Sequence, residues 1–346
     1  MKLHRVVAGA PVDQLTGMVL CHDVTANNVR LRKGQVLQLD DLLPLRSVAP
    51  GEMHLIELEQ GELTEEQAGR RLATATAGDG VSPMAPSLGH WPLVANRRGV
   101  LSVSINALRE ANLVEGVGIY TLFNGQIVDT DEHVARAKIA PLVMKDQLVT
   151  EVERIAQNAE GLIRVRPFLP RRIGVVVAET LAESSAGRIR AVLAEKVSWL
   201  GSTLLDPVFV PLETEPLLAA MQEQLAAGAE VLLVAGTRPM DPLDASWHAL
   251  QQFGVTVERF GVPAHPGSLL WIAWRGDVAI LGVPTCGVFS RASVMDLILP
   301  RILAGERVGR VELAELGHGG FLTRDYAFRF PPYRGGGKYR GEVEDE

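Results

Sequence analysis

Hydrophobic residues follow different patterns before and after residue 172, and the later part of the chain is the more regular. Residues 173–178 and 230–235 are almost continuously apolar over the length of a buried strand. Between them, apolar residues recur at helical spacing up to Gly201, which can end a helix: Ile189, Val192, Leu193, Val197 and Leu200. Further strand patterns cover 204–210, 255–260, 269–274 and 278–281, and further helix patterns cover 216–227, 244–253 and 288–303. This alternation predicts an α/β fold, in which a mostly parallel sheet lies in three layers with helices on both faces.

The first 160 residues predict smaller, strand-rich regions. Residues 17–24 and 53–58 have strand character, and residues 64–67 have a capping-box form that predicts a helix to about residue 76. Residues 77–92 are rich in Gly, Pro and Ser, as is typical of a connector. Strand patterns over 100–103, 117–123, 127–128 and 134–144 follow, with a hairpin turn at Asn124-Gly125 and a helix over 145–158. We therefore expect an α+β region at 1–85, a β-rich unit at 93–160, the α/β domain at 171–320 and a mobile tail at 321–346.

The composition of the 346 residues is that of a globular protein, with 47% hydrophobic and 22% charged residues. A net charge of −7 weighs against a broad nucleic-acid interface, and no apolar run reaches the ~18 residues that span a membrane. The apolar run at the N-terminus is too short for a signal peptide. We therefore expect a cytoplasmic protein that binds neither nucleic acid nor membrane. Its two cysteines, Cys21 and Cys286, are too few for a Cys-rich zinc site.

Familiar catalytic and nucleotide-binding motifs are absent from the sequence. It contains no P-loop, no Gly-x-Ser-x-Gly elbow and no His-Glu-x-x-His zinc motif. Gly116 and Gly118 lack the third glycine of a dinucleotide-binding fingerprint, and no pair of the eight histidines has metal-ligand spacing. The candidate chemistry therefore lies in the loops of the α/β domain.

Ligands of open α/β sheets bind beyond the carboxyl ends of the strands, which makes the loop after residue 235 the first candidate. Gly236 allows close approach of the backbone, and Thr237 offers a hydroxyl and N–H groups to a phosphate. Arg238 could pair with the same phosphate, and Asp241 could hold Mg²⁺ and take part in catalysis. Asp244 stands where a carboxylate is typical of a helix N-cap. The alternative for the whole loop is a purely structural turn between a strand and a helix.

Two further loops follow strands of the expected sheet. Residues 261–268 contain a Pro-Gly turn, and residues 282–287 lead into the final helix, whose N-terminal amides would point at a ligand. The candidate binding residues in these loops are Pro266, Gly267, Ser268, Gly282, Pro284, Thr285, Cys286 and Gly287. A Pro-Gly turn is more commonly structural, and a lone cysteine is more commonly a small core residue.

The order of these loops resembles the molybdopterin-binding domain of molybdenum-cofactor biosynthesis, found in molybdopterin adenylyltransferase and molybdopterin molybdotransferase. Residues 17–24 and 317–322 look like a molybdotransferase-like branch, so the resemblance spans most of the chain. The loop motifs that carry it are Gly236-Thr237, Asp241, Pro266-Gly267 and residues 282–287. The resemblance implies that the protein binds molybdopterin or its adenylylated form, uses Mg²⁺ and forms a homodimer.

In family enzymes, carboxylates position Mg²⁺ against the anionic groups, and the resemblance implies that Asp241 and Glu179 do so here. The leading hypothesis is a molybdopterin- or molybdenum-cofactor-binding protein of cofactor biosynthesis or insertion, with Mg²⁺-dependent molybdotransferase activity as one form of it. Residues 178–185 depart from the acidic Thr/Ser-Gly-Asp-Glu segment of those enzymes. That departure favours a second hypothesis, a non-catalytic carrier, sensor or chaperone that serves a partner molybdoenzyme. A third is that the fold binds another nucleotide, because fold does not determine function.

Overall fold

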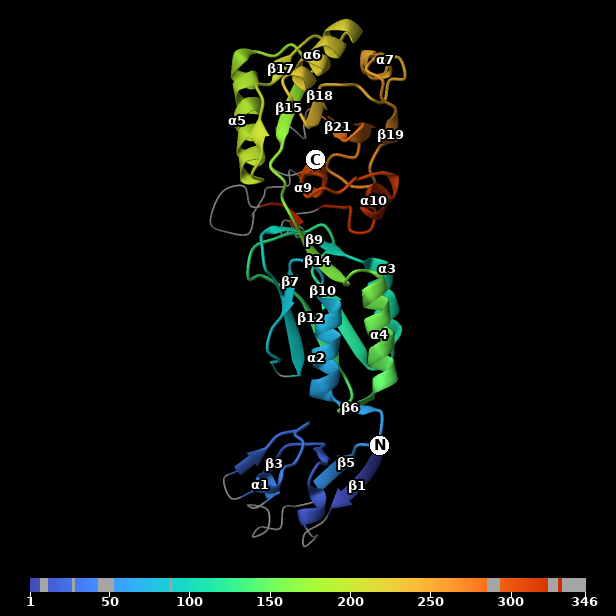
Figure 1. Ribbon diagram of the computed structural model, residues 1–346. Coiled ribbons are helices and arrows are strands. Elements are labelled where there is room, and N and C mark those ends of the chain that lie inside the picture. Colours follow the sequence, from blue (N-terminus) through green and yellow to red (C-terminus); the bar gives the residue numbers. More distant parts are fainter. Residues whose placement is uncertain are drawn as a thin grey trace. The chain divides into compact units, whose positions relative to one another are not determined.

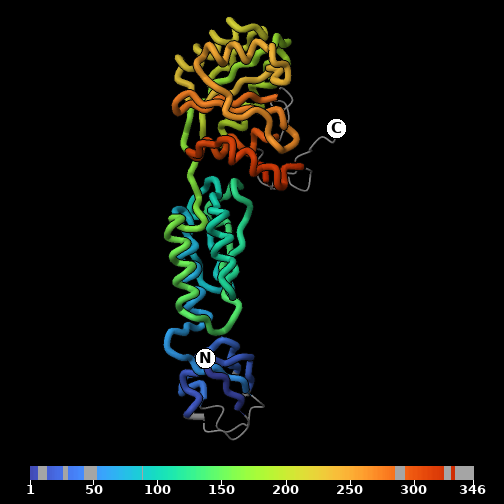
Figure 2. Tube along the Cα trace, turned by 90° about the vertical axis from the view of Figure 1, so that its right-hand side faces the viewer, coloured from blue at the N-terminus to red at the C-terminus, as the bar shows by residue number. Residues whose placement is uncertain are grey.

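The structure is a computed structural model that describes residues 1–6, 12–26, 29–42, 53–87, 89–284, 293–322 and 329–331. The chain folds into two compact units (Figure 1; Figure 2 gives a second view). Unit 1 comprises Met1–Arg97, Leu101–Asn124 and Val128–Val165, and unit 2 comprises Arg98–Val100, Gly125–Ile127 and Arg166–Glu346. The finer boundaries expected near residues 85, 93 and 160 stay predictions.

The beginning of unit 1 consists of short elements. Strands β1 (Lys2–Val6), β5 (Met53–Glu57) and β2 (Val19–Leu20) form an antiparallel sheet in the order β1-β5-β2. The strand expected over 17–24 is therefore shorter, and β3 (Val24–Ala26) pairs instead with β4 (Val29–Leu31). A 3-10 turn (Val12–Leu15) and helix α1 (Leu39–Leu42) complete this region.

A four-stranded antiparallel sheet and its helices form the main core of unit 1. The sheet has the order β10-β12-β8-β7, from β10 (Val117–Thr121), β12 (His133–Ile139), β8 (His90–Ala95) and β7 (Val81–Pro83). Helices α2 (Glu65–Thr76), α3 (Ile105–Leu113) and α4 (Asp146–Asn158) contribute to the same apolar core. Two smaller sheets are β6 (Glu62–Thr64) with β13 (Val143–Lys145), and β11 (Ile127–Val128), β9 (Gly99–Val103) and β14 (Ile163–Pro167).

The structure confirms one local prediction in this unit and corrects two. The capping box of α2 is present, since the Thr64 side chain accepts from Gln67 N at 3.3 Å and Gln67 Oε1 accepts from Thr64 N at 3.1 Å. Residues 77–92 are not a plain connector, because they contain β7 and the start of β8. The Asn124-Gly125 turn is not a hairpin, since β10 pairs with β12 and β11 pairs with β9. Asn124 Oδ1 accepts from Val103 N at 3.0 Å, which explains why the chain turns there toward another sheet.

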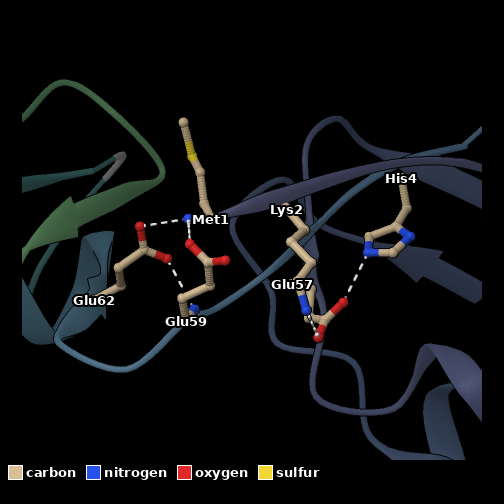
Figure 3. Close-up of polar contacts among 6 residues, drawn as sticks. All are labelled: Met1, Lys2, His4, Glu57, Glu59 and Glu62. Carbon is tan, nitrogen blue, oxygen red and sulfur yellow. Dashed lines mark hydrogen bonds and ion pairs between the residues drawn. The ribbon is translucent and has the colours of Figure 1, made fainter.

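Charged groups of β1 and the N-terminal amine pair with Glu57 of β5 and Glu62 of β6 (Figure 3). Lys2 Nζ lies 3.2 Å from Glu57 Oε1, and His4 Nε2 lies 2.9 Å from Glu57 Oε2. The Met1 amine lies 2.7 Å from Glu62 Oε1. Hydrogen bonds from Lys2 and His4 hold the pKa of Glu57 below its usual range. These pairs are at least partly exposed to solvent, so we expect only a small contribution to stability from each.

Arg71 of α2 is the main polar link to α4. Its Nε and Nη2 donate to the two carboxylate oxygens of Glu153 at 2.8 and 2.7 Å, and it also bonds Asp146 and Thr150. The hydrogen bonds from Arg71 hold the pKa of Glu153 below its usual range. Helices α2 and α4 are thereby joined in a fixed register.

Unit 2 is built on a seven-stranded, mostly parallel sheet in the order β16-β15-β18-β21-β20-β19, with β17 also beside β15. Strand β15 pairs in parallel with β16, β17 and β18, β18 pairs in parallel with β21, and β20 and β19 are antiparallel additions. The strands are β15 (Arg172–Val177), β16 (Thr203–Leu204), β17 (Val208–Phe209), β18 (Val231–Ala235), β19 (Val257–Phe260), β20 (Trp271–Arg275) and β21 (Val278–Val283). The helices are α5 (Glu183–Trp199), α6 (Thr214–Ala226), α7 (Ala245–Gln252), α9 (Met295–Leu303) and α10 (Arg310–Glu315).

The strands and helices predicted for this unit are largely confirmed. The strand expected over 204–210 is divided into β16 and β17. The first part of the helix expected over 288–303 lies outside the described residues, and α9 begins at Met295.

The central strands are buried on both sides, which accounts for their continuous apolar sequence. Val175 belongs to one core cluster together with residues of α5 and α9. Val176 belongs to another, together with residues of α6 and α7. Both valines are 0% exposed.

A buried ion pair joins α5 to α9. Lys196 Nζ lies 2.8 and 3.0 Å from the two carboxylate oxygens of Asp296, and both residues are buried. Asp296 Oδ2 also accepts from Ser293 N at 2.7 Å, which secures the chain just before α9. The carboxylate therefore links the two helices and the entry to α9.

Two residues of the segment expected as a mobile tail are buried. Leu322 and Phe330 are 2% and 4% exposed and belong to the same cluster as α5 and α9. Residues 323–328 and 332–346 lie outside the described residues, so a mobile tail at 321–346 stays a prediction. In the described ranges, no helix combines the length and apolar character needed to cross a membrane.

Replacing Lys196 by Met should destabilise unit 2 by about 3–5 kcal/mol, because Asp296 would stay buried without its cation. The double variant Lys196→Met/Asp296→Leu should recover part of this loss, since it removes the orphaned charge. Denaturant unfolding of both variants measures the difference. Wild-type stability in Lys196→Met would contradict this role of the pair.

The Arg71–Glu153 pair should make unit 1 pH-sensitive. The folded pKa of Glu153 lies below its unfolded value, so the pair is fully stabilising above about pH 4 and is lost as the pH falls through the folded pKa. Arg71→Lys keeps the charge but not the bidentate geometry. Its stability deficit against wild type should therefore shrink as the pH is lowered from about 7 to about 3. Thermal unfolding across that range tests this, with the exposed Arg70→Lys as control; a constant deficit would refute it.

Candidate functional site

The topology of unit 2 brings the candidate loops to one edge of the seven-stranded sheet. The last residues of the three parallel strands are level, since Val177 pairs with Ala235 and Ala235 with Val283. The antiparallel β20 begins at the same level, because Trp271 pairs with Gly282. The loops after β15, β18 and β21 and the loop before β20 therefore share one edge, which we call the carboxyl edge.

Gly236 holds the loop after β18 against the end of β15. Its φ is +79°, and a Cβ there would lie 2.9 Å from the carbonyl oxygen of Ala178. Ala178 N donates to Ala235 O at 2.8 Å, so the segments that follow β15 and β18 lie close together at this point. The register of β18 against β21 directs the Gly236 N–H toward Val283 O, because Ala235 bonds β15 and Pro284 has no N–H. In the part of the chain that the structure describes, the N–H group of Thr237 donates no hydrogen bond. One backbone donor of this loop is therefore open to a ligand at the carboxyl edge.

Asp244 has the structural role predicted for it. It is the N-cap of α7, with Oδ1 accepting from Ser246 N at 2.9 Å, and it also bonds the Ser246 hydroxyl. Its Oδ2 accepts from Arg238 N at 3.2 Å, and the residue is only 5% exposed. Both carboxylate oxygens are thus used to fold the loop, and the Arg238 side chain itself is exposed.

Asp241 lies on the surface of the same loop. Its Oδ1 accepts from Leu243 N at 2.9 Å, and its backbone oxygen accepts from Trp247 Nε1 at 3.0 Å. Glu179 is also exposed and follows β15 at the carboxyl edge. Mg²⁺ prefers oxygen ligands and needs only one or two carboxylates, so these residue types fit it. Among the described residues, no group of three or more His, Cys, Asp or Glu side chains could hold a metal ion.

The Pro266-Gly267 turn packs against the entry to α9. Pro266 O accepts from Val294 N at 3.0 Å, and a Cβ on Gly267, whose φ is +110°, would lie 3.1 Å from Val294. Ser268 O accepts from Val262 N at 2.8 Å and closes the loop.

The third loop differs from expectation at its start. Gly282 belongs to strand β21 rather than to the loop, and a Cβ there would overlap the indole of Trp271. This packing against Trp271 explains why position 282 is a glycine. Pro284 directly follows the strand, whereas Thr285, Cys286 and Gly287 lie outside the described residues.

The N-terminus of α5 was not singled out from the sequence. Its N-cap is Ala182, and no side chain caps it. Within the described ranges, the N–H groups of Glu183 and Ser184 donate no hydrogen bond. The missing Ser, Thr, Asp or Asn at the cap position was the available signal.

A cavity of about 570 Å³ in unit 1 is a less suitable site. It lies along α2 and α4, and Arg71, Glu153 and Ala156 are among its lining residues. Arg71 already donates to Glu153, Asp146 and Thr150, so it has little capacity left for a ligand. The carboxyl edge offers open backbone donors and is therefore the stronger candidate.

Comparisons with known proteins give a partial family match and distant structural likenesses. A family model described as a domain of unknown function (DUF8806) matches residues 10–57, within unit 1. No curated protein matches the chain. Among solved structures, the molybdopterin biosynthesis MoeA protein from Pyrococcus horikosii is 11% identical, with 70% of this chain and 79% of that chain covered, at a TM-score of 0.28. A NadC deletion mutant is 12% identical, with 55% and 79% covered, at a TM-score of 0.17. TM-scores this low do not establish a shared fold.

The close approach at Gly236 predicts a difference between two glycines of similar conformation. Gly254 has the same φ of +79° but open space around it. Gly254→Ala should cost about 1 kcal/mol for the left-handed backbone alone. Gly236→Ala should cost about 1–3 kcal/mol more, because its Cβ meets the Ala178 backbone. Denaturant unfolding of both variants tests this, and equal losses would rule out the close approach.

Proposed function

We propose that the carboxyl edge of the seven-stranded sheet binds molybdopterin or its adenylylated form, and that the protein acts in molybdenum-cofactor biosynthesis or insertion. The proposal includes the three-layer arrangement of unit 2, a homodimer and a cytoplasmic location. The observation that carries it is the level ending of β15, β18 and β21, with open backbone N–H groups at Thr237 and at the start of α5.

The chemistry of a pterin phosphate suits these donors. Backbone N–H groups at a strand-to-loop turn and at a helix N-terminus bind anions through hydrogen bonds and aligned dipoles. Thr237 provides one such N–H group, and the uncapped start of α5 at Glu183 provides others. The exposed Arg238 side chain can add a charged partner for the same phosphate. Pro266, Gly267, Ser268, Gly282, Pro284, Thr285, Cys286 and Gly287 complete the proposed binding set.

Asp241 and Glu179 are the proposed Mg²⁺ ligands. A bound Mg²⁺ would neutralise part of the phosphate charge. Asp241 can spare an oxygen for it, because in the described ranges only its Oδ1 accepts a hydrogen bond. Asp244 cannot serve in this way, because its two oxygens already cap α7 and bond Arg238 N.

A second candidate function is a non-catalytic carrier, sensor or chaperone for a molybdoenzyme. It is favoured by the segment between β15 and α5, where Glu179 is the only carboxylate before Glu183. Glu183 itself pairs with Arg190 at 3.1 Å. Binding through backbone donors needs no further carboxylate, whereas metal-assisted transfer does.

Binding and turnover distinguish these functions. The purified protein should bind molybdopterin and adenylylated molybdopterin in an equilibrium titration. Release of AMP on addition of Mg²⁺ and molybdate would identify an inserting enzyme, and binding without release would identify the carrier. Binding of another nucleotide with neither pterin would overturn the proposal.

Asp241→Asn should abolish Mg²⁺-dependent AMP release and leave the fold intact. The asparagine Oδ1 can still accept from Leu243 N, so the loop keeps its hydrogen bond. Asp277→Asn is the control, because this exposed residue lies in the turn between β20 and β21, away from the carboxyl edge. Unchanged AMP release in Asp241→Asn would remove this residue from the mechanism.

A further inference from the structure

The Pro266-Gly267 turn is held from one side by a segment far away in the sequence. His265 N donates to Gly320 O at 2.8 Å, and Leu322 N donates to His265 O at 3.0 Å. These two hydrogen bonds form a parallel bridge between His265 and Phe321. The residue directly before the turn is therefore fixed by residues 317–322, which we call the C-terminal clamp.

The entry to α9 holds the turn from the other side. Pro266 O accepts from Val294 N at 3.0 Å, and Gly267 packs on Val294. Val294 is itself placed by Asp296, which accepts from the neighbouring Ser293 N at 2.7 Å. The turn thus lies between two backbone supports and has little freedom to shift alone.

The C-terminal clamp is anchored in unit 2. Leu322 is 2% exposed and belongs to the core, and Arg329 Nη1 donates to Gly319 O at 2.7 Å. Gly320 leaves no room for a side chain, because a Cβ there would collide with the carbonyl oxygens of Pro263 and Leu316. Phe321, in contrast, exposes 76% of its surface, so its place in the clamp depends on its backbone.

We propose that the C-terminal clamp positions the Pro266-Gly267 turn for ligand binding, so that Gly320 and Leu322 set the affinity of the carboxyl edge. The inference rests on the proposed function, in which this turn contacts the pterin. The clamp residues act through His265 and are positioning residues. Small displacements of a turn weaken its hydrogen bonds to a ligand steeply, because these bonds need the right distance and angle.

Gly320→Ala tests the proposal directly. Its Cβ should push the clamp away from Pro263, lower the affinity for molybdopterin about tenfold or more, and leave the global unfolding transition cooperative. Hydrogen–deuterium exchange should rise in a peptide covering residues 261–270. A control in the same segment, Phe321→Ala, should bind within about twofold of wild type, because it removes only an exposed ring.

Leu322→Ala decides the matter if Gly320→Ala does not fold. It loosens the anchor but keeps both hydrogen bonds to His265, so exchange over residues 261–270 and the dissociation constant should rise together. Raised exchange with unchanged affinity would overturn the inference while leaving the proposed function standing. If the wild-type protein binds no pterin, the proposed function fails. In that case the positioning of the turn by the clamp is tested by hydrogen–deuterium exchange alone. Faster exchange over residues 261–270 in Gly320→Ala supports it, and unchanged exchange overturns it.

Discussion

Burial of the central strands on both faces is the constraint on which the rest of unit 2 depends. A strand with one solvated face can tolerate some error in pairing, but a slip by one residue in a doubly buried strand moves every side chain into the wrong core. Val175 and Val176 are both fully buried, in different clusters. Their alternation sets the register of β15 against β18, and β18 sets that of β21. The three strands therefore end at the same level, and the candidate site follows from that level ending.

The same constraint explains how much of the fold could be predicted. Continuous apolar runs and helical spacing are local signals, so β15, β18 and α5 are found where the sequence indicates them. Capping residues are local as well, and Thr64 and Asp244 cap α2 and α7 as expected. Strand pairing depends on distant partners. The Asn-Gly signal at residue 124 therefore identified a turn but not the sheets that it connects.

The distinction between local signals and contacts with distant segments also applies to the candidate site and to the C-terminal segment. The edge of the sheet and most of its loops could be predicted, because the alternation of strands and helices determines where loops must lie. The sequence alone predicts a loop at Gly282, because glycine is common in loops. The reason for a glycine there is the indole of Trp271 on the neighbouring strand, which local sequence does not reveal. Phe330 was expected in a mobile tail because proline and glycine surround it, yet it is buried in a core formed by distant segments. The composition of a segment indicates how much apolar surface it can bury by itself. It does not show whether distant segments of the chain form a core in which a residue such as Phe330 is buried.

The glycines near the carboxyl edge are explained by packing, and this affects how the resemblance of the sequence pattern is interpreted. Gly236 and Gly282 leave no room for a side chain against Ala178 and Trp271, and Gly267 packs closely on Val294. A chain with this sheet would need them whether or not it bound a pterin. Their order along the sequence therefore indicates the way in which loops pack at the carboxyl edge, and the case for a ligand depends on groups that the fold does not use. These are the open N–H groups at Thr237 and at the start of α5.

The balance between those open donors and the carboxylates bears on what the site can do. Backbone donors hold a phosphate in any protonation state that accepts hydrogen bonds, and they need no metal. The carboxylates are more limited, since Asp244 is committed to capping α7 and Glu183 pairs with Arg190. Asp241 and Glu179 remain, both exposed to water, where a charge binds Mg²⁺ more weakly than in a desolvated site. The open donors at the carboxyl edge thus suit an anionic ligand better than its exposed carboxylates suit a metal-dependent reaction. In the proposed function, Asp241 is the residue on which Mg²⁺-dependent AMP release depends.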